Sequence, residues 1–187
     1  MRKLGLIKLG LVLLLVGLSL PAMAAQDEEA NVEAFGGYSY LHFDLKGAQA
    51  SSSSLNGFNA AVTANLNRHL GLTGDFSAHF GGFRYGFDSV HEFSVLAGPH
   101  LHLGYRRFSP FVHALAGVTR FSQSFSVTPP EPEASSTGFT LALGGGVDYR
   151  ISPGFYVRAA QADYMLAHLF STNRNNIRLS TGVVFKF

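Results

Sequence analysis

The chain has 187 residues and no cysteine, and only 14% of its residues are charged, against about 25% in ordinary soluble domains. The lack of cysteine excludes disulfides, thiolate catalysis and a lipid-modified cysteine. Three of the 14 Lys and Arg residues lie within the first 24, so residues 25–187 carry 11 basic and 12 acidic residues, a balance that argues against a nucleic-acid-binding face.

The first 24 residues have the pattern of a secretory signal peptide. Basic residues at Arg2 and Lys3 precede the apolar stretch 9–20, and Ala22-Met23-Ala24 fits an A-x-A cleavage site. The apolar stretch is shorter than the roughly 20 residues that a permanent membrane helix needs, although a retained anchor is the alternative. We expect residues 1–24 to be removed on export and residues 25–187 to form one domain.

The rest of the chain reads as eight strand-like segments separated by clusters of turn-forming residues. No helix-length amphipathic stretch competes with them. In chain order, the predicted strands span residues 32–43, 57–67, 70–81, 90–102, 108–121, 138–150, 155–169 and 176–187.

The third segment shows the alternation most clearly. Leu72 and Phe76 alternate with Asp75 and His79. Successive side chains of a strand point to opposite faces, so one face is apolar and the other polar. The second, sixth and eighth segments alternate in the same way. The residues expected to face lipid are Phe58, Val62, Leu66, Leu72, Phe76, Leu141, Val147, Leu179 and Val183.

The seventh segment breaks this rule. Arg158 shares a face with Ala160 and Tyr164, whereas Gln161 and Asp163 lie on the opposite face. Neither face is cleanly apolar unless a bulge shifts the register or the far end of the strand lies beyond the membrane. The sequence leaves both explanations open.

The predicted connections alternate between long and short. The long ones span 45–54, 82–89, 122–136 and 170–175, and the short ones 68–69, 103–107 and 151–154. Short periplasmic turns and longer external loops are typical of outer-membrane barrels, and an even strand count leaves both termini on the periplasmic side.

Two physical constraints then select the fold class. A sheet that spans lipid must close on itself so that every backbone polar group is paired, and eight strands leave an interior that side chains just fill. We therefore predict an all-β fold, an eight-stranded antiparallel up-and-down transmembrane β-barrel, with a packed polar lumen and no wide pore.

Several runs of the sequence resemble a known family. They are residues 93–99, 109–118, 144–150, 163–164 and 179–187, together with Arg158. These runs are similar to strands of small outer-membrane β-barrel proteins, the OmpA-type and opacity-protein group. The resemblance implies export and insertion into a Gram-negative outer membrane. Full-length OmpA-type proteins add a periplasmic peptidoglycan-binding domain that this sequence does not show, so cell-wall tethering is not implied.

The last segment resembles the signal that the barrel-assembly machinery reads. Its apolar series is Leu179, Val183, Phe185 and Phe187, which Thr181 interrupts. The alternative is that this is simply a final apolar strand.

Charged residues on the predicted inner face need partners, because an unpaired desolvated charge costs several kcal/mol. We predict a paired network that plugs the lumen, with a conducting path as the alternative. The predicted lumen network consists of Asp75, His79, Glu92, Asp148, Arg158, Arg178 and Lys186.

The sequence offers little for catalysis or metal binding. His100 and His102 point to the same side, but His-x-His alone is a weak metal signal. Ser94, Glu92 and His113 could be assembled into a nucleophile, an acid and a base, yet no motif of a known hydrolase surrounds them. We expect no catalytic site, no metal and no cofactor.

The leading functional hypothesis is a non-enzymatic outer-membrane barrel that supports envelope integrity or surface interaction. Its expected partners are outer-membrane lipid, the assembly machinery during biogenesis, and a surface ligand held by loops 45–54 and 122–136. One alternative is a barrel enzyme that acts on outer-membrane lipid or peptide. Another is a soluble lipocalin-like barrel, whose apolar positions would face inward.

Overall fold

The computed structural model describes residues 31–43, 53–83, 87–104, 107–124, 133–169 and 172–187. The signal peptide predicted over residues 1–24 lies outside them. Among the described residues, no helix has the length and apolar character needed to cross a membrane.

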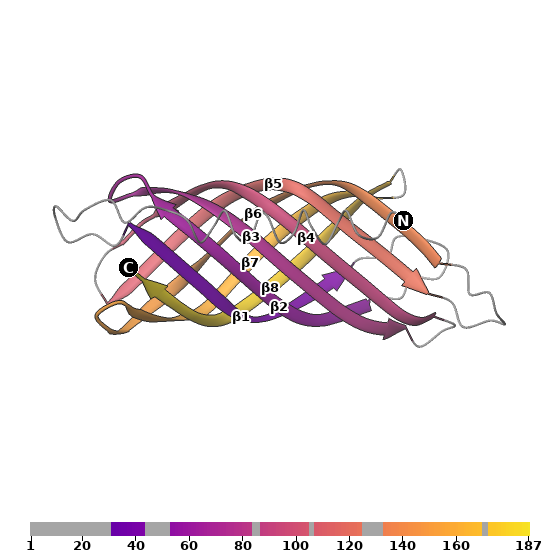
Figure 1. Cartoon of the computed structure of the whole chain (residues 1–187), viewed down its shortest axis with the longest axis horizontal. Helices are drawn as coiled ribbons and strands as arrows, with labels where there is room; N and C mark the ends of the chain where they lie inside the picture. The colour runs from indigo at the N-terminus through magenta and orange to yellow at the C-terminus, as the bar shows by residue number, and fades with distance from the viewer. Residues whose placement is uncertain (1–30, 44–52, 84–86, 105–106, 125–132, 170–171) are drawn as a thin grey trace, which may run out of the picture.

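Eight antiparallel strands close into one barrel (Figure 1). Each strand pairs with the next in the sequence, and the first pairs with the last, which confirms the predicted fold class. The strands are β1 (Val32–Phe43), β2 (Ser53–Asn65), β3 (Leu70–Phe83), β4 (Phe87–His102), β5 (Phe108–Ser124), β6 (Glu133–Ser152), β7 (Phe155–Leu169) and β8 (Thr172–Lys186).

The strand register turns apolar side chains outward and charged ones inward. On β3, Leu72 is 55% exposed whereas Asp75 is 3% exposed. Of the nine residues expected to face lipid, eight are exposed and Val147 is half-buried. The lipocalin-like alternative is therefore wrong, because it requires the opposite orientation of both faces.

Several strands are longer than predicted. The extra residues lie at the end of the barrel opposite the start of β1 and the end of β8. Residues 53–54, 82–83, 87–89, 122–124, 133–136 and 172–175, which were predicted as loops, belong to strands. The backbone ladder does not depend on apolar side chains, and it continues here through pairs such as Ser122 with Ser135. The remaining parts of the predicted long loops lie outside the described residues.

The opposite end of the barrel has tight connections. The predicted turn 151–154 shortens to Pro153-Gly154, since β6 runs to Ser152. Gly154 adopts a φ of +74°, a left-handed conformation that favours glycine. Glu33 pairs with Lys186 across the β1–β8 seam, so the start of β1 and the end of β8 both lie at this end of the barrel. By the rule for outer-membrane barrels, this is the periplasmic end.

A bulge in β7 resolves the irregular seventh segment. Val147 of β6 pairs with Ala160, but the next residue, Asp148, pairs with Arg158. The extra residue on β7 leaves Ala159 and Ala160 both exposed and turns Arg158 into the lumen. Of the two explanations that the sequence left open, the bulge accounts for the pattern.

The lumen is only partly polar, which corrects the expectation of a wholly polar interior. A cluster of nine buried apolar residues, here called the apolar cap, fills much of its outer half. Such side chains fill space without needing hydrogen-bond partners, so they close the interior as effectively as a polar network. The cap consists of Leu41, Leu55, Val90, Leu96, Leu115, Phe121, Ala142, Met165 and Ala167.

The seam between β1 and β8 depends on two facing glycines. Gly37 and Gly182 are paired, and a Cβ on Gly182 would lie 2.3 Å from the carbonyl oxygen of Gly36. A Cβ on Gly37 would lie 2.1 Å from the carbonyl oxygen of Thr181. The backbone itself occupies the space that a side chain would need, so barrel closure requires glycine at both positions.

Candidate functional site

The lumen holds three groups of polar side chains and opens into a hollow at the periplasmic mouth. The outermost group is centred on His79 of β3. Its Nδ1 lies 2.6 Å from Glu92 Oε2, and its Nε2 lies 2.8 Å from Ser39 Oγ. Ser94 donates its hydroxyl hydrogen to Glu92, and its Oγ lies 2.8 Å from Thr119 Oγ1. Strands β1, β3, β4 and β5 are thereby linked through the interior.

The middle group is centred on Arg178 of β8, whose side chain is fully buried. Its Nη1 donates to Asp75 Oδ1 at 2.7 Å, and its Nε donates to Asp163 Oδ2 at 2.8 Å. Asp163 also contacts His113 Nε2 at 2.7 Å and accepts a hydrogen bond from Gln161. One guanidinium therefore joins carboxylates from β3 and β7, which are not neighbouring strands.

The innermost group holds Arg158 between two rings. Its guanidinium donates to both carboxylate oxygens of Asp148, at 2.8 and 3.1 Å, and to Gln161 at 2.8 Å. Its central carbon lies 4.3 Å from the ring centroid of Phe35 and 4.2 Å from that of Phe111. Hydrogen bonds in its plane and aromatic faces above and below fix this side chain across the lumen.

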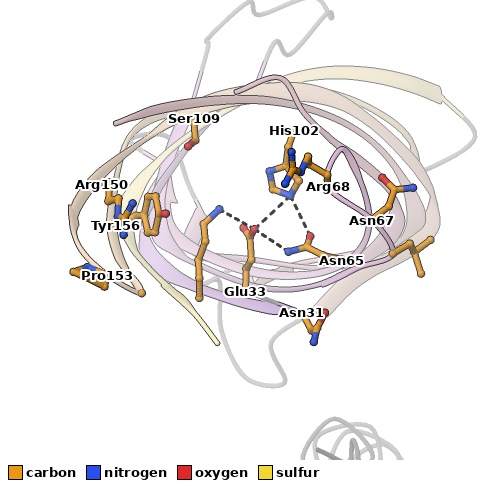
Figure 2. A pocket seen from close by; sticks show the side chains of 13 residues that line it. Asn31, Glu33, Asn65, Asn67, Arg68, His102, Ser109, Arg150, Pro153 and Tyr156 are labelled. Carbon is orange, nitrogen blue, oxygen red and sulfur yellow. Dashed lines mark hydrogen bonds and ion pairs between the residues drawn. The ribbon is translucent and has the colours of Figure 1, made fainter. Parts of the chain in front are cut away.

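Below Arg158 the lumen widens into a hollow of about 690 Å³ at the periplasmic mouth (Figure 2). Glu33 is central to it: its Oε1 accepts from Lys186 Nζ at 2.8 Å and Asn65 Nδ2 at 3.1 Å, and lies 3.4 Å from His102 Nε2. Lys186 also lies over the ring of Tyr156, with 4.7 Å from Nζ to the centroid. The other lining residues are Asn31, Leu66, Asn67, Arg68, Ser109, Arg150, Pro153 and Gly154.

All seven residues of the predicted network lie in the lumen or at its mouth, and each contacts an acidic, basic or imidazole side chain. The pairs within the set are His79 with Glu92 and Asp148 with Arg158. A third pair within the set joins Asp75 and Arg178. Lys186 pairs outside the set, with Glu33.

The sequence reasoning missed several of the network's residues. They include Ser39, Glu33, His113 and Asp163. Asp163 lies in the seventh segment, whose faces the sequence left unassigned, and its pairing with Arg178 is revealed only by the closed barrel. Glu33 lies in the noisy first segment, where no sequence pattern distinguishes it.

Only two of the three residues that were considered for catalysis lie in contact with each other. Ser94 does contact Glu92, but His113 pairs with Asp163 instead. The histidine beside Glu92 is His79, and its other neighbour is Ser39. Ser94, Glu92 and His113 therefore do not form the arrangement that was considered and set aside from the sequence. The Ser39–His79–Glu92 arrangement has the connectivity of a hydrolytic triad, but all three side chains are buried.

His100 and His102 point to the same side, as predicted, and that side is the lumen, where their ring centroids lie 4.5 Å apart. The ring of His100 stacks on Phe111 at 4.7 Å, and His102 lies beside Glu33. Within the described part of the chain, no three His, Asp or Glu side chains are arranged to hold a metal ion. The histidines act here as packed lumen residues.

Thr181, which interrupts the apolar series of the last strand, has a local role. Its hydroxyl donates to the backbone carbonyl of Arg158 at 2.9 Å, at the β7 bulge. A bulge leaves backbone groups outside the regular ladder, so a neighbouring hydroxyl satisfies one of them. The other four residues of the series, Leu179, Val183, Phe185 and Phe187, are exposed on the outer face.

The sequence matches the family described as "Outer membrane protein beta-barrel domain" over residues 10–187. No curated protein matches it. The solved structure of Ail, the attachment invasion locus protein of Yersinia pestis, has 24% sequence identity and a TM-score of 0.63, covering 84% of this chain and all of that one. Ail has also been solved in complex with the heparin analogue sucrose octasulfate.

Two further structures share the fold. Neisserial surface protein A has 16% identity and a TM-score of 0.67, and the N-terminal β-barrel domain of OprF from Pseudomonas aeruginosa has 15% identity and a TM-score of 0.51. Each similarity covers 86% of this chain and all of the other chain. At these identities the likeness concerns the fold.

Proposed function

We propose that this chain, which belongs to the outer membrane protein β-barrel domain family, is a non-enzymatic barrel that supports envelope integrity or presents external loops for surface interaction. Family and fold indicate an outer-membrane protein in contact with membrane lipid. The proposal adds that the lumen is a structural plug and that recognition lies outside it.

The observation that carries the proposal is the closed lumen. Arg158 and Arg178 lie across it in succession, each held by carboxylates, and the apolar cap fills much of the outer half. An ion crossing this path would have to displace paired charges and then enter an apolar segment, both at a cost of several kcal/mol. The interior therefore supports a scaffold role better than transport.

The absence of enzymatic activity is part of the same proposal. The Ser39–His79–Glu92 arrangement is buried, with 0% exposure at Ser39 and His79, so a lipid or peptide substrate has no access to the hydroxyl. A nucleophile must meet its substrate at about 3 Å. The arrangement is better explained as a satisfied polar network inside a narrow barrel.

The outer ends of the strands support the surface role. Ladder pairing between β5 and β6 continues to Ser124 and Glu133, so the paired part of this hairpin extends past the exposed apolar residues Val118 and Phe139. Loops on a rigid scaffold are common recognition sites. We propose that segments 45–54 and 122–136, including their strand-forming ends, carry a surface ligand.

Two steps of biogenesis complete the proposal. Residues 1–24 act as a cleaved signal peptide, and the apolar series that ends at Phe187 is read by the barrel-assembly machinery. The support for the second step is that Leu179, Val183, Phe185 and Phe187 share the outer face of β8 and contribute little to the lumen.

A loop-replacement experiment tests the surface role. Residues 45–52 and 125–132 are replaced by Gly-Ser segments of equal length, and cells displaying either protein are titrated with labelled sucrose octasulfate, the probe suggested by the Ail complex. The expected result is binding to cells with the intact protein and loss of binding with the replaced loops, while heat-modifiable gel migration shows both barrels folded. Equal binding by both would contradict a role for these loops.

A further inference from the structure

His100 of β4 is a buried polar side chain whose ring nitrogens lack hydrogen-bond partners. It is 2% exposed, and neither its Nδ1 nor its Nε2 is bonded to any of the described residues. Phe111 stacks on the ring, with 4.7 Å between centroids and 19° between planes, and this packing leaves the nitrogens at the ring edge unsatisfied. A neutral imidazole has one donor and one acceptor nitrogen, and burying either one unpaired incurs its full desolvation penalty. His100 therefore requires a partner that the described residues do not supply.

Glu33 of β1 carries a second unpaired polar atom. Its Oε1 receives the hydrogen bonds from Lys186 and Asn65 that Figure 2 shows. Its Oε2 is buried and has no partner among the described residues. A carboxylate oxygen only accepts hydrogen bonds, so Oε2 requires a donor.

Both unpaired groups line the same small cavity in the lumen. Its volume is about 10 Å³, and Glu33 lies between it and the larger hollow at the periplasmic mouth, since this residue lines both. Thr63 and Thr73 also line the small cavity, and their hydroxyl oxygens lie 2.7 Å apart. A buried cavity of roughly 10–15 Å³ that offers two to four polar groups has the size and chemistry to hold one water molecule. An organic ligand does not fit in this volume.

We propose that this cavity is a binding site for one structural water molecule, which donates a hydrogen bond to Glu33 Oε2 and bonds to one ring nitrogen of His100. Water can donate to an acceptor nitrogen or accept from an N–H, so it suits either tautomer of the ring. Glu33 and His100 lie on β1 and β4, which are not neighbouring strands, so the water links them across the lumen. A metal ion is the less suitable occupant, because no three described His, Asp or Glu side chains are arranged to hold one.

The test observes the water directly in the whole protein, folded in deuterated detergent micelles with isotope-labelled histidine. Nuclear Overhauser effects are recorded between the water signal and the histidine ring protons. His79 is the internal control, since Glu92 and Ser39 already contact both of its ring nitrogens. The variant His100→Phe keeps an aromatic ring beside Phe111 and assigns the His100 signals by their loss.

Two further arms exclude other sources of the signal. Thr63→Val combined with Thr73→Val removes the hydroxyl protons that could relay magnetisation from solvent to His100. A spectrum recorded after dialysis against EDTA tests for a bound metal ion. Heat-modifiable migration checks that each variant is folded.

We expect a cross-peak from the water signal to the His100 ring, with the sign of a long-lived internal water, and none to the His79 ring. The cross-peak should persist in the double threonine variant and after EDTA treatment. The proposal is overturned if His100 shows no cross-peak, if His79 shows an equal one, or if the cross-peak disappears with the threonine hydroxyls. A shift of the His100 nitrogen signals on EDTA treatment would also overturn it, because the occupant would then be a metal ion.

Discussion

The inner and outer faces of the same eight strands follow opposite rules. Inside, Arg178 is fully buried and contacts two carboxylates, while outside, Leu141 is 44% exposed. A charge is tolerated inside because it is paired, and an apolar residue outside because lipid surrounds it. Removing a charge from the inner face and adding a charge to the outer face should therefore both destabilise the barrel. The variants below test that difference between the faces.

The largest effect is expected at Arg178. Arg178→Met leaves Asp75 and Asp163 buried without their shared cation, and breaking a buried pair costs about 3–5 kcal/mol. Urea unfolding in lipid vesicles measures the loss. Arg120→Met, which changes an exposed arginine of β5, is the control and should lie within about 0.5 kcal/mol of the native chain. Equal stability of the two variants would mean that the lumen charges are solvated and the lumen is not closed.

The reverse change on the outer face should be nearly as costly. Leu141→Arg places a charge on the lipid face of β6, and such a charge near the bilayer midplane costs about 2–4 kcal/mol. Thr137→Arg lies on the same face of β6, four residues towards the outer end, where the cost falls to about 0–1 kcal/mol. The same unfolding series compares the two. If Thr137→Arg is the more damaging, then Leu141 does not lie closer to the bilayer midplane than Thr137, contrary to our assignment.

A smaller loss of stability is expected when a methyl group is added to the inner face of the β1–β8 seam, and none when it is added to the outer face. Gly182→Ala forces a Cβ against the Gly36 carbonyl oxygen, and overpacking of this kind costs about 1–3 kcal/mol. Gly36→Ala is the matched control on the outer face, since no atom lies within 4 Å of the Cβ it would add. We expect a lower unfolding midpoint for Gly182→Ala alone. A comparable loss in both variants would implicate strand flexibility rather than steric closure.

The sequence predicted the parts of the fold that depend on alternation. Over residues 70–80 of β3 and 177–185 of β8, apolar residues recur at alternate positions, interrupted by Gly74 and Thr181, and the strand count and the orientation of both faces follow from that period. It underestimated strand length, because residues such as Ser122 and Ser135 join the ladder through backbone groups that any residue supplies. It also missed the apolar cap, since inward apolar residues such as Leu41 and Met165 look like noise in an alternating pattern.

The site was predicted less completely than the fold, for a related reason. Inward charges can be identified one strand at a time, but their partners are set by closure and shear of the barrel. Arg178 and Asp75 are 103 residues apart and lie on β8 and β3, so no local spacing connects them. The bulge that places Arg158 beside Asp148 was foreseen only as one of two possibilities.

The smallest effect on stability, with a large effect on delivery, is expected at Phe187. Its side chain is 74% exposed at the periplasmic rim, and its backbone pairs with Val32 through hydrogen bonds of 2.8 and 3.3 Å. Deleting it removes little burial against protein, so refolding yield in detergent should change little. If the assembly machinery reads the apolar series of β8, the outer-membrane yield in cells should fall several-fold. Phe108→Ala is the control, because Phe108 is similarly exposed, at 65%, but lies outside that series. Equal losses in cells and in detergent would make Phe187 a structural residue, and no loss in either would show that the terminal series is incidental to assembly.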